Sequence, residues 1–373
     1  MENISMIINR LPAPTWNRLR MNDSRLELPA CADVCAPKVA FQGSVCLNKS
    51  GVQPAADKAC CGCAAAAGCP AHSVDFTKMP TGMGPDMELL GAAGHTLRLT
   101  ADAGPSIAAV TLRYGDGQSC YNSLQIEARE GSDVTVLMTY ISTAAAAGTS
   151  VVQTKINAAA GAKVKLVQVQ LLGSGFTHLN DVGGRLAAGA RLETLQLQLG
   201  GGKAYNGVCA ELVGDGSSFE AAAGYYGRRG QRIDMNFVAN HYGKNTVCNM
   251  NADGVLQSGA FKLYRGTIDF KNGCAGAVGD EKETVLLLSD DVTNQSIPLI
   301  LCSEEDVQGN HGASIGKLDE DLLFYLCSRG FSEQEAIDMM AKAKIEALCR
   351  KIGDEDTVQL VERYLEGVIA DGQ

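Results

Sequence analysis

Aromatic side chains are scarce in this sequence. Phe, Tyr and Trp together make up 5% of the 373 residues, with a single Trp, whereas Gly accounts for 42 positions. Hydrophobic residues still reach 46%, which is enough to form a core and excludes a wholly disordered chain. We therefore expect many thin elements stacked around small side chains.

An excess of basic residues is also missing. The net charge is −10, and residues 303–373 hold sixteen acidic and seven basic side chains, so that segment alone carries −9 and the first 302 residues carry −1. Nucleic-acid binding depends on a basic face. We expect no nucleic-acid partner.

The sequence has no long apolar run. The uncharged stretch between Asp133 and Lys155 is interrupted by Thr, Ser and Gln, too often for a membrane-spanning helix. Residues 1–20 lack the apolar segment of a signal peptide. The fourteen Cys are scattered along the chain, which is typical of free thiols in a reducing compartment. We expect a cytoplasmic protein without membrane contact.

Proline is absent from Ser106 to Ile297, so no residue there lacks the donor that a strand needs. Small-residue turns precede a series of short apolar runs, and they contain Gly131, Gly161, Gly189, Gly216 and Gly243. The interval between successive glycines stays nearly constant, and a steady interval of this kind is typical of repeat architectures.

Between these turns apolar residues alternate along the chain, as in Val164, Leu166, Val169 and Leu171. Such alternation predicts strands. Together with the glycine series it predicts a mainly β protein, in which positions 90–316 form a parallel β-helix with coils of roughly 27 residues. An antiparallel sandwich with regular turns is the alternative.

Helical periodicity replaces the strand pattern after Gly316. The spacing predicts a short helix that ends at Gly330, a second helix capped by Ser332 with Glu335 three residues on, and a third from about Thr357. We expect residues 317–373 to be a small acidic α-helical domain.

The first 89 residues are the least regular. Leu11–Arg20, with Pro14 and the only Trp, is interpreted as a short lead-in helix, and the segment from Cys31 to Pro85 as a linker rich in Cys, Gly and Ala. The linker holds the densest group of thiols in the chain: Cys60, Cys61, Cys63 and Cys69. Thiolates can bind a soft metal, but the second Cys pair of a zinc site is missing.

The segment from Glu281 to Gly330 closely resembles the SufB/SufD family. The resemblance lies in the strings His311-Gly-Ala-Ser-Ile-Gly-Lys-Leu-Asp-Glu320 and Leu323-Phe-Tyr-Leu-Cys-Ser-Arg-Gly330, and in the lead-in Leu11-Pro-Ala-Pro-Thr-Trp-Asn-Arg-Leu-Arg20. It implies iron–sulfur cluster assembly on a right-handed parallel β-helix. It also implies a C-terminal helical domain that docks a SufC-like ABC ATPase, and pairing with a SufB-like chain through the β-helix ends.

The resemblance also suggests which residues matter. His311 matches a family His near the assembly interface, where a transient iron–sulfur cluster forms, and its Asn-His-Gly-Ala context is SufD-like. Glu283 aligns with the scaffold cysteine of SufB-type chains, and a carboxylate cannot accept sulfur. Cys302 could compensate, although a buried strand cysteine is the alternative. The implied ATPase contacts are Leu322, Phe324, Tyr325 and Arg329. The alternative for Leu322, Phe324, Tyr325 and Leu326 is that they pack against the β-helix.

We therefore expect a non-enzymatic, SufD-like assembly subunit. The alternative within the family is a SufB-like scaffold that forms a homodimer and holds the nascent cluster itself. A polysaccharide-active β-helix enzyme is disfavoured because carboxylates do not recur in register along the strands. Whether this chain ligates the cluster, and whether it binds flavin, stays open.

Overall fold

The computed structural model describes residues 3–15, 17–50, 75–93, 95–317 and 319–371. Its strands are β1 (Asn3–Ile8), β2 (Ser24–Pro29), β3 (Lys38–Ser50), β4 (His95–Arg113), β5 (Ser119–Ala128), β6 (Ser132–Ile141), β7 (Ala147–Ala158), β8 (Lys163–Leu171), β9 (Gly175–Leu186), β10 (Arg191–Gln198), β11 (Lys203–Leu212), β12 (Ser218–Gly227), β13 (Arg232–His241), β14 (Val247–Leu256), β15 (Phe261–Phe270), β16 (Ala277–Leu287), β17 (Thr293–Cys302) and β18 (Val307–Lys317). Its helices are the 3-10 turns η1 (Asn17–Leu19), η2 (Phe76–Lys78) and η3 (Pro85–Ala93) and the α-helices α1 (Glu320–Ser328), α2 (Glu333–Cys349) and α3 (Glu355–Asp371).

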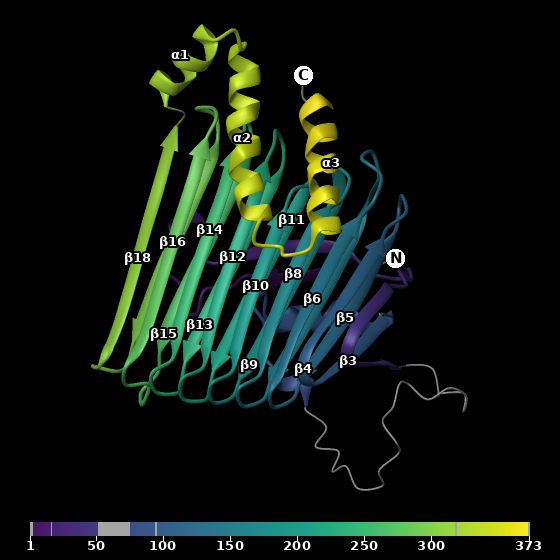
Figure 1. Cartoon of the computed structure of the whole chain (residues 1–373), viewed down its shortest axis with the longest axis vertical. Helices are drawn as coiled ribbons and strands as arrows, with labels where there is room; N and C mark the ends of the chain where they lie inside the picture. The colour runs from purple at the N-terminus through teal and green to yellow at the C-terminus, as the bar shows by residue number, and fades with distance from the viewer. Residues whose placement is uncertain (1–2, 16, 51–74, 94, 318, 372–373) are drawn as a thin grey trace, which may run out of the picture.

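Strands β4 to β18 form a parallel β-solenoid (Figure 1). The even-numbered strands from β6 to β18 pair in one row and the odd-numbered strands from β5 to β17 in the other. The long strand β4 joins the rows, because its first part pairs with β5 and its second part with β6. The prediction of a parallel β-helix is confirmed, and the antiparallel sandwich is excluded.

The coil length follows the glycine series. The first residues of β8, β10 and β12 are Lys163, Arg191 and Ser218, and they are register partners on successive coils. Each strand begins shortly after one of the turn glycines Gly161, Gly189 and Gly216, which have φ between 65° and 67°. This left-handed conformation favours glycine, so the glycines recur once per coil.

One turn differs from the expected glycine series. The left-handed residue in the turn before β14 is Asn245, at φ 55°, rather than Gly243. Asn tolerates this conformation better than most residues that carry a Cβ. The turn therefore contains a left-handed residue like the others, although that residue is not the expected glycine.

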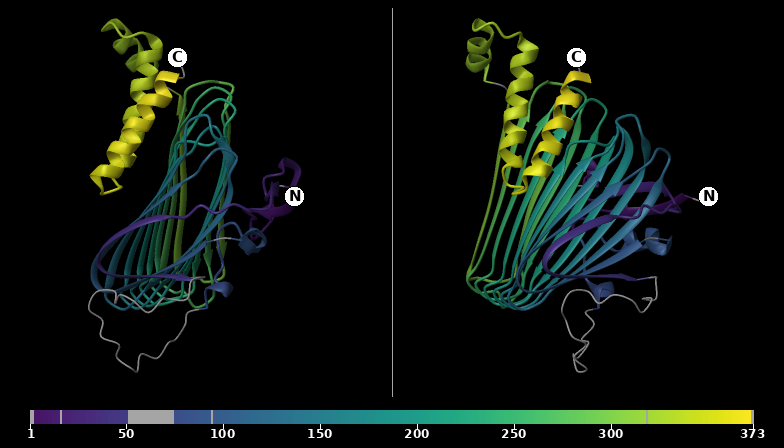
Figure 2. Two further views of the ribbon diagram at one scale, coloured as in Figure 1. Left: turned by 90° about the vertical axis from the view of Figure 1, so that its right-hand side faces the viewer. Right: turned by 45° about the vertical axis from the view of Figure 1, so that its right-hand side comes forward.

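The two outer faces of the solenoid are covered by different parts of the chain, as Figure 2 shows. Helices α2 and α3 pack on the even row, where Ile345 and Leu365 join a cluster with Val167 and Leu197. The N-terminal segment packs on the odd row, where Met6 and Met83 contribute to a second cluster. Within the described residues, no helix is both long and apolar enough to span a membrane.

The prediction of a lead-in helix over Leu11–Arg20 is wrong. The described residues between 11 and 20 contain one helical element, the 3-10 turn η1, and the flanking strands β1 and β2 pair antiparallel. The backbone N–H of Leu11 donates to Asn22 O at 2.8 Å, which closes the hairpin. Pro12 and Pro14 lack amide donors, and Leu11 and Met21 bury against Leu263 of β15, so the hairpin buries its apolar residues where a free helix would not. Trp16 lies outside the described residues.

The interpretation of residues 31–85 as a linker is also incomplete. This segment contains β3, which pairs antiparallel with nearly the whole of β4 and closes the N-terminal end of the solenoid. The four linker thiols Cys60, Cys61, Cys63 and Cys69 lie outside the described residues.

Candidate functional site

The C-terminal end of the solenoid is an open edge. Among the strands that the structure describes, β17 and β18 are the last of their rows, so each has a neighbour on one side only. Every residue of β18 after Val307 is exposed, and Figure 1 shows this strand at the free edge of the sheet. An edge strand offers unpaired backbone donors and acceptors to a partner.

His311 lies on this open edge. It is the register partner of Glu281 on β16, so both side chains project to the same side of the sheet. That side is the solenoid interior, because Val285, four residues further along β16 and therefore on the same side of the strand, belongs to the central core. The imidazole is therefore exposed in the last coil, directly above a buried carboxyl group.

Beneath His311 the interior contains buried charges. Glu283 and Lys262 form an ion pair between side chains that are at most 2% exposed, and Ser296 Oγ donates to the Glu283 carboxylate. Burial lowers the pKa of Lys262, and the Glu283 charge opposes that shift. Lys262 and Ser296 thus stabilise the buried Glu283 carboxylate.

Glu281 is less fully paired, although the Lys262 charge opposes the rise of its pKa. Its Oε2 atom is buried without a hydrogen-bond partner among the described residues, and burial followed by the nearby Glu283 charge raises its pKa to about 8. Its carboxyl group occupies the space beside Gly266, where a Cβ would lie 2.3 Å from the Glu281 carboxyl carbon. Glu281 was missed in the sequence because the run Asp280-Glu-Lys-Glu283 resembles a solvated surface strand, and Lys262 was missed because it lies on a different strand, β15.

Cys302 differs from the expectation of a buried strand cysteine. It is exposed, because β17 is an edge strand, and its thiol donates to Glu304 O at 3.0 Å. The structure does not bring Cys302 and His311 together: Ile300, two residues before Cys302, lies against Gly309, two residues before His311. The two strands run in opposite directions across the interior, so moving two residues forward on each leads away from this contact in opposite directions. Four residues of strand therefore separate Cys302 from His311, which is roughly 13 Å.

No compact metal site forms around these candidates. Among the residues that the structure describes, no three His, Cys, Asp or Glu side chains gather closely enough to hold a metal ion. His311 and Glu281 are therefore a pair that could supply ligands to an iron atom only together with other groups.

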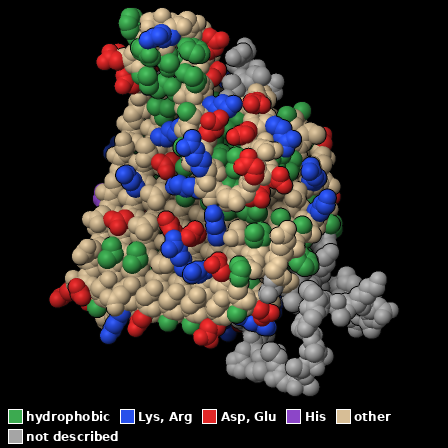
Figure 3. Space-filling model, in the orientation of Figure 1, with side chains coloured by type: hydrophobic (Ala, Val, Ile, Leu, Met, Phe, Trp, Pro, Cys, Tyr) green, Lys and Arg blue, Asp and Glu red, His purple; other side chains and the backbone are tan. Residues whose placement is uncertain are grey.

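A second candidate site is α1, which follows β18 directly (Figure 1). Asp319 caps the helix, and none of its residues is buried. Leu322, Phe324 and Tyr325 are 41%, 77% and 50% exposed, and Arg329 places its guanidinium 5.0 Å from the Tyr325 ring centroid. Figure 3 shows hydrophobic side chains gathered at the top of the molecule, where α1 lies.

These exposures exclude the interpretation in which the α1 side chains pack against the β-helix. Packing against the β-helix would have buried Leu322, Phe324 and Tyr325, whereas the buried contacts of the helical region come from α2 and α3. The sequence placed all four residues on one short helix. In the structure Leu322, Phe324 and Tyr325 lie in α1 and Arg329 is its C-cap, but the sequence could not indicate that the helix projects away from the core.

Comparisons with known proteins agree with this architecture. The family model described as "SUF system FeS cluster assembly, SufBD core domain" matches residues 111–344, more than half of the chain. A similar curated protein is the iron–sulfur cluster assembly protein SufD of Bacillus subtilis, 26% identical over 232 residues, which are 62% of this chain and 53% of that protein.

Two further relatives are described as iron–sulfur cluster assembly SufBD family proteins. The one from Mycobacterium leprae is 26% identical over 188 residues, which are 50% of this chain and 22% of that protein. The one from Staphylococcus epidermidis is 28% identical over 161 residues, which are 42% of this chain and 35% of that protein. The match thus spans between about a fifth and about half of the length of these relatives.

Proposed function

The chain belongs to the SufBD core family of the SUF system for iron–sulfur cluster assembly, and from this we propose that it is a SufD-like, non-enzymatic subunit of an assembly complex. In this proposal the chain pairs with a SufB-like scaffold through the open end of its solenoid. It docks a SufC-like ABC ATPase through α1, and the ATPase hydrolyses the nucleotide. The nascent iron–sulfur cluster is cargo shared at the subunit interface.

The observation that carries the proposal is the exposed apolar surface of α1. Phe324 is 77% exposed on a helix without any buried residue, which is costly for an isolated chain because large apolar side chains favour burial. Apolar anchors at helical spacing, docked into a groove, are a common mode of protein recognition. Tyr325 and Arg329 add residue types that are enriched at interaction hot spots.

The open end supports pairing with a second chain. Strand β18 offers an exposed edge, and His311 there faces the last coil beside Glu281. A partner solenoid that abuts this edge would bring its own ligands to the same place. Position 283 carries a carboxylate bound to Lys262 and Ser296, so this chain assists cluster assembly rather than accepting sulfur there.

The test is a binding measurement with a SufC-like ATPase and a SufB-like chain. Phe324→Asp and Tyr325→Asp should each weaken ATPase binding by about 30-fold or more, the level of an interface hot spot, while circular dichroism stays unchanged. Val213→Asp, at another exposed apolar position (37% exposed), is the matched control. Normal binding by both α1 variants would contradict the docking role.

Co-purification separates the two roles within the family. A SufD-like subunit should recover a SufB-like chain in a mixed complex. A homodimer that holds a cluster without a second type of chain would instead favour the SufB-like scaffold.

A further inference from the structure

The solenoid interior contains rows of buried amide side chains. On the even row, Gln168 of β8 is the register partner of Gln196 of β10. On the odd row, Asn180 of β9 is the register partner of Asn206 of β11. All four face the interior and are at most 1% exposed. Each of the two successive coils therefore has one Gln on the even row and one Asn on the odd row, at equivalent positions.

The first of these pairs is complete. Gln168 Nε2 donates to Asn180 Oδ1 at 2.9 Å, and Asn180 Nδ2 donates to Gln168 Oε1 at 2.9 Å. This reciprocal pair bridges the two rows across the interior. Equivalent placement of Gln196 and Asn206 one coil further predicts a second bridge.

The second bridge does not form. Gln196 Nε2 donates back to Gln168 Oε1 at 3.0 Å, which leaves Gln196 Oε1 and both amide atoms of Asn206 without a hydrogen-bond partner among the described residues. Further unpartnered atoms lie on inward-facing neighbours in the same coils: Thr194 Oγ1, both amide atoms of Gln198 and Nε2 of His178.

Unpartnered atoms at this density need an occupant. A buried donor or acceptor without a partner loses its hydration and gains nothing in return, and several together would cancel the modest stability of a folded domain. The side chains cannot escape to solvent, because Asn206 and His178 are 0% exposed. Both donors and acceptors are unpartnered, so the occupant has to donate as well as accept.

Ions do not suit this position. Among the inward-facing residues of β8 to β11, strands that are described throughout, His178 is the one ionisable side chain, and burial lowers its pKa to about 3, which keeps the imidazole neutral. A charge buried without a counter-charge is strongly unfavourable. A small neutral molecule that both donates and accepts fits the group.

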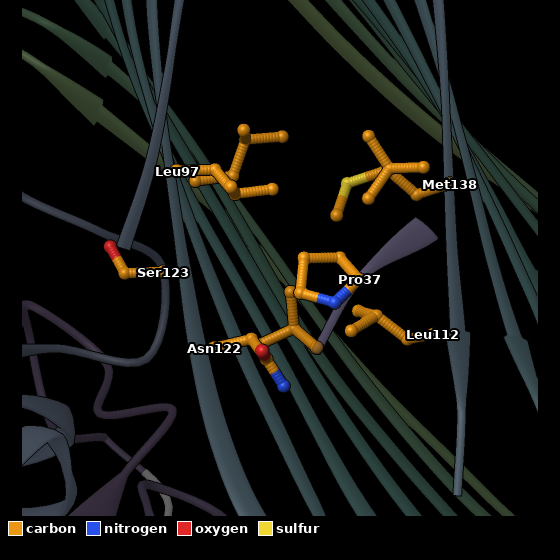
Figure 4. A pocket seen from close by; sticks show the side chains of 9 residues that line it. Pro37, Leu97, Leu112, Asn122, Ser123 and Met138 are labelled. Atoms are coloured by element: carbon orange, nitrogen blue, oxygen red, sulfur yellow. The ribbon is translucent and has the colours of Figure 1, made fainter. Parts of the chain in front are cut away.

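A small cavity near the first coil lies beside another unpartnered amide, that of Asn122. It measures about 10 Å³ and is lined by Asn122, both of whose amide atoms are buried without a partner among the described residues. Figure 4 shows Pro37 between Asn122 and Leu112 at this cavity. Its volume is about that of one enclosed water molecule.

We propose that the solenoid interior binds structural water molecules, with one site that bridges Gln196 and Asn206 and another beside Asn122. Water supplies the donors and acceptors that the amides lack and completes across β10 and β11 the bridge that Gln168 and Asn180 make directly. The site does not depend on the partners or the cluster.

A crystal structure of the full chain at a resolution that shows ordered water is the direct test. We expect a water oxygen within about 3.2 Å of the Asn206 amide and of Gln196 Oε1. A direct reciprocal contact between Gln196 and Asn206, without water density between them, would overturn the proposal.

Thermal unfolding of Asn206→Leu is an independent test. If water bridges this site, the substitution removes two of its partners and the melting temperature falls. If the site is dry, the substitution removes an unpaired amide and the melting temperature rises or stays the same, which contradicts the proposal. Asn180→Leu is the matched control, because it breaks a direct pair and should lower the melting temperature in either case.

Discussion

At the scale of single residues, solvent exposure separates the candidate groups more clearly than their chemical identity. His311 and Cys302 are exposed at the open end, whereas His178 and Glu283 are buried and engaged in the interior. The sequence identified His311 through its family context. It could not show the exposure of Cys302, because that depends on the place of β17 at the end of its row.

His311→Ala tests the role of the exposed imidazole. Neutral imidazole is a good ligand for iron, so the variant should lower the iron and sulfide content of the assembled complex severalfold, measured by colorimetric assay after gel filtration. Subunit association should not change. Replacement of Cys60, Cys61, Cys63 and Cys69 together by Ser is the control and should keep the cluster. Loss of the cluster in that control and its retention in His311→Ala would move the site to the linker.

Sulfur acceptance is tested separately at Cys302. Incubation with a cysteine desulfurase and cysteine should leave Cys302 without a stable persulfide, as determined by mass spectrometry of alkylated peptides. This expectation follows from the proposed function, in which the chain assists assembly and does not accept sulfur. Cys302 is exposed and a thiolate is the nucleophile in such transfers, so lack of access would not explain a negative result. A stable persulfide on Cys302 would make this chain a sulfur acceptor.

His178 predicts a pH dependence of stability. Burial lowers its pKa from an ordinary value of 6.5 to about 3, so the unfolded chain binds a proton more tightly than the folded chain between these values. Stability is therefore full above about pH 6.5 and falls as the pH drops toward 3. His178→Gln should reduce this slope, measured by urea unfolding at pH 4.5 and 7.5. Equal loss of stability on acidification in both proteins would contradict the assignment.

At the scale of elements, local signals predicted ends and turns well. The capping box of Ser332 and Glu335 is present at the start of α2, and Gly330 has a positive φ after α1. Such features depend on a few neighbouring residues, so the sequence contains the necessary information.

Elements that depend on distant contacts were predicted poorly. Strand β3 is held by pairing with β4, so that Lys38 lies opposite Thr111, and β1 is held by burial of Met6 and Ile8 on the odd row. Nothing within either segment indicates its partner. The buried Lys262–Glu283 pair was missed for the same reason, because its partners lie on different strands.

Glycine substitutions test the turn conformation directly. Gly189→Ala should destabilise the solenoid by about 1 kcal/mol, because its φ of 65° is unfavourable for a residue with a Cβ. Space is not the cause, since nothing lies within 4 Å of the added Cβ. Gly367→Ala in α3 also meets nothing within 4 Å, and should stabilise by about 0.5–1 kcal/mol because Ala favours helix. Chemical denaturation measures both, and equal effects of the same sign would contradict the conformational explanation.

At the scale of the whole molecule, the described segments cover the solenoid unevenly. Strand β3 covers the N-terminal end, the hairpin of β1 and β2 covers the odd row, and α2 and α3 cover the even row, whereas β18 is exposed at the other end. The sequence predicted the repeat and its period, because every coil contributes to them. Which surfaces are covered depends on segments outside the repeat and could not be derived from it.

This asymmetry predicts where a second chain binds. Ile315 on β18 is 49% exposed on the open edge, and Ile315→Asp should abolish co-purification with a SufB-like chain, because pairing would bury the new charge without a partner. Leu89→Asp is the matched control: Leu89 is 55% exposed, but it lies on η3, away from the open end. Light scattering after gel filtration measures both complexes. Loss of the complex in Leu89→Asp, together with its retention in Ile315→Asp, would place the interface on the N-terminal segment instead of the exposed edge.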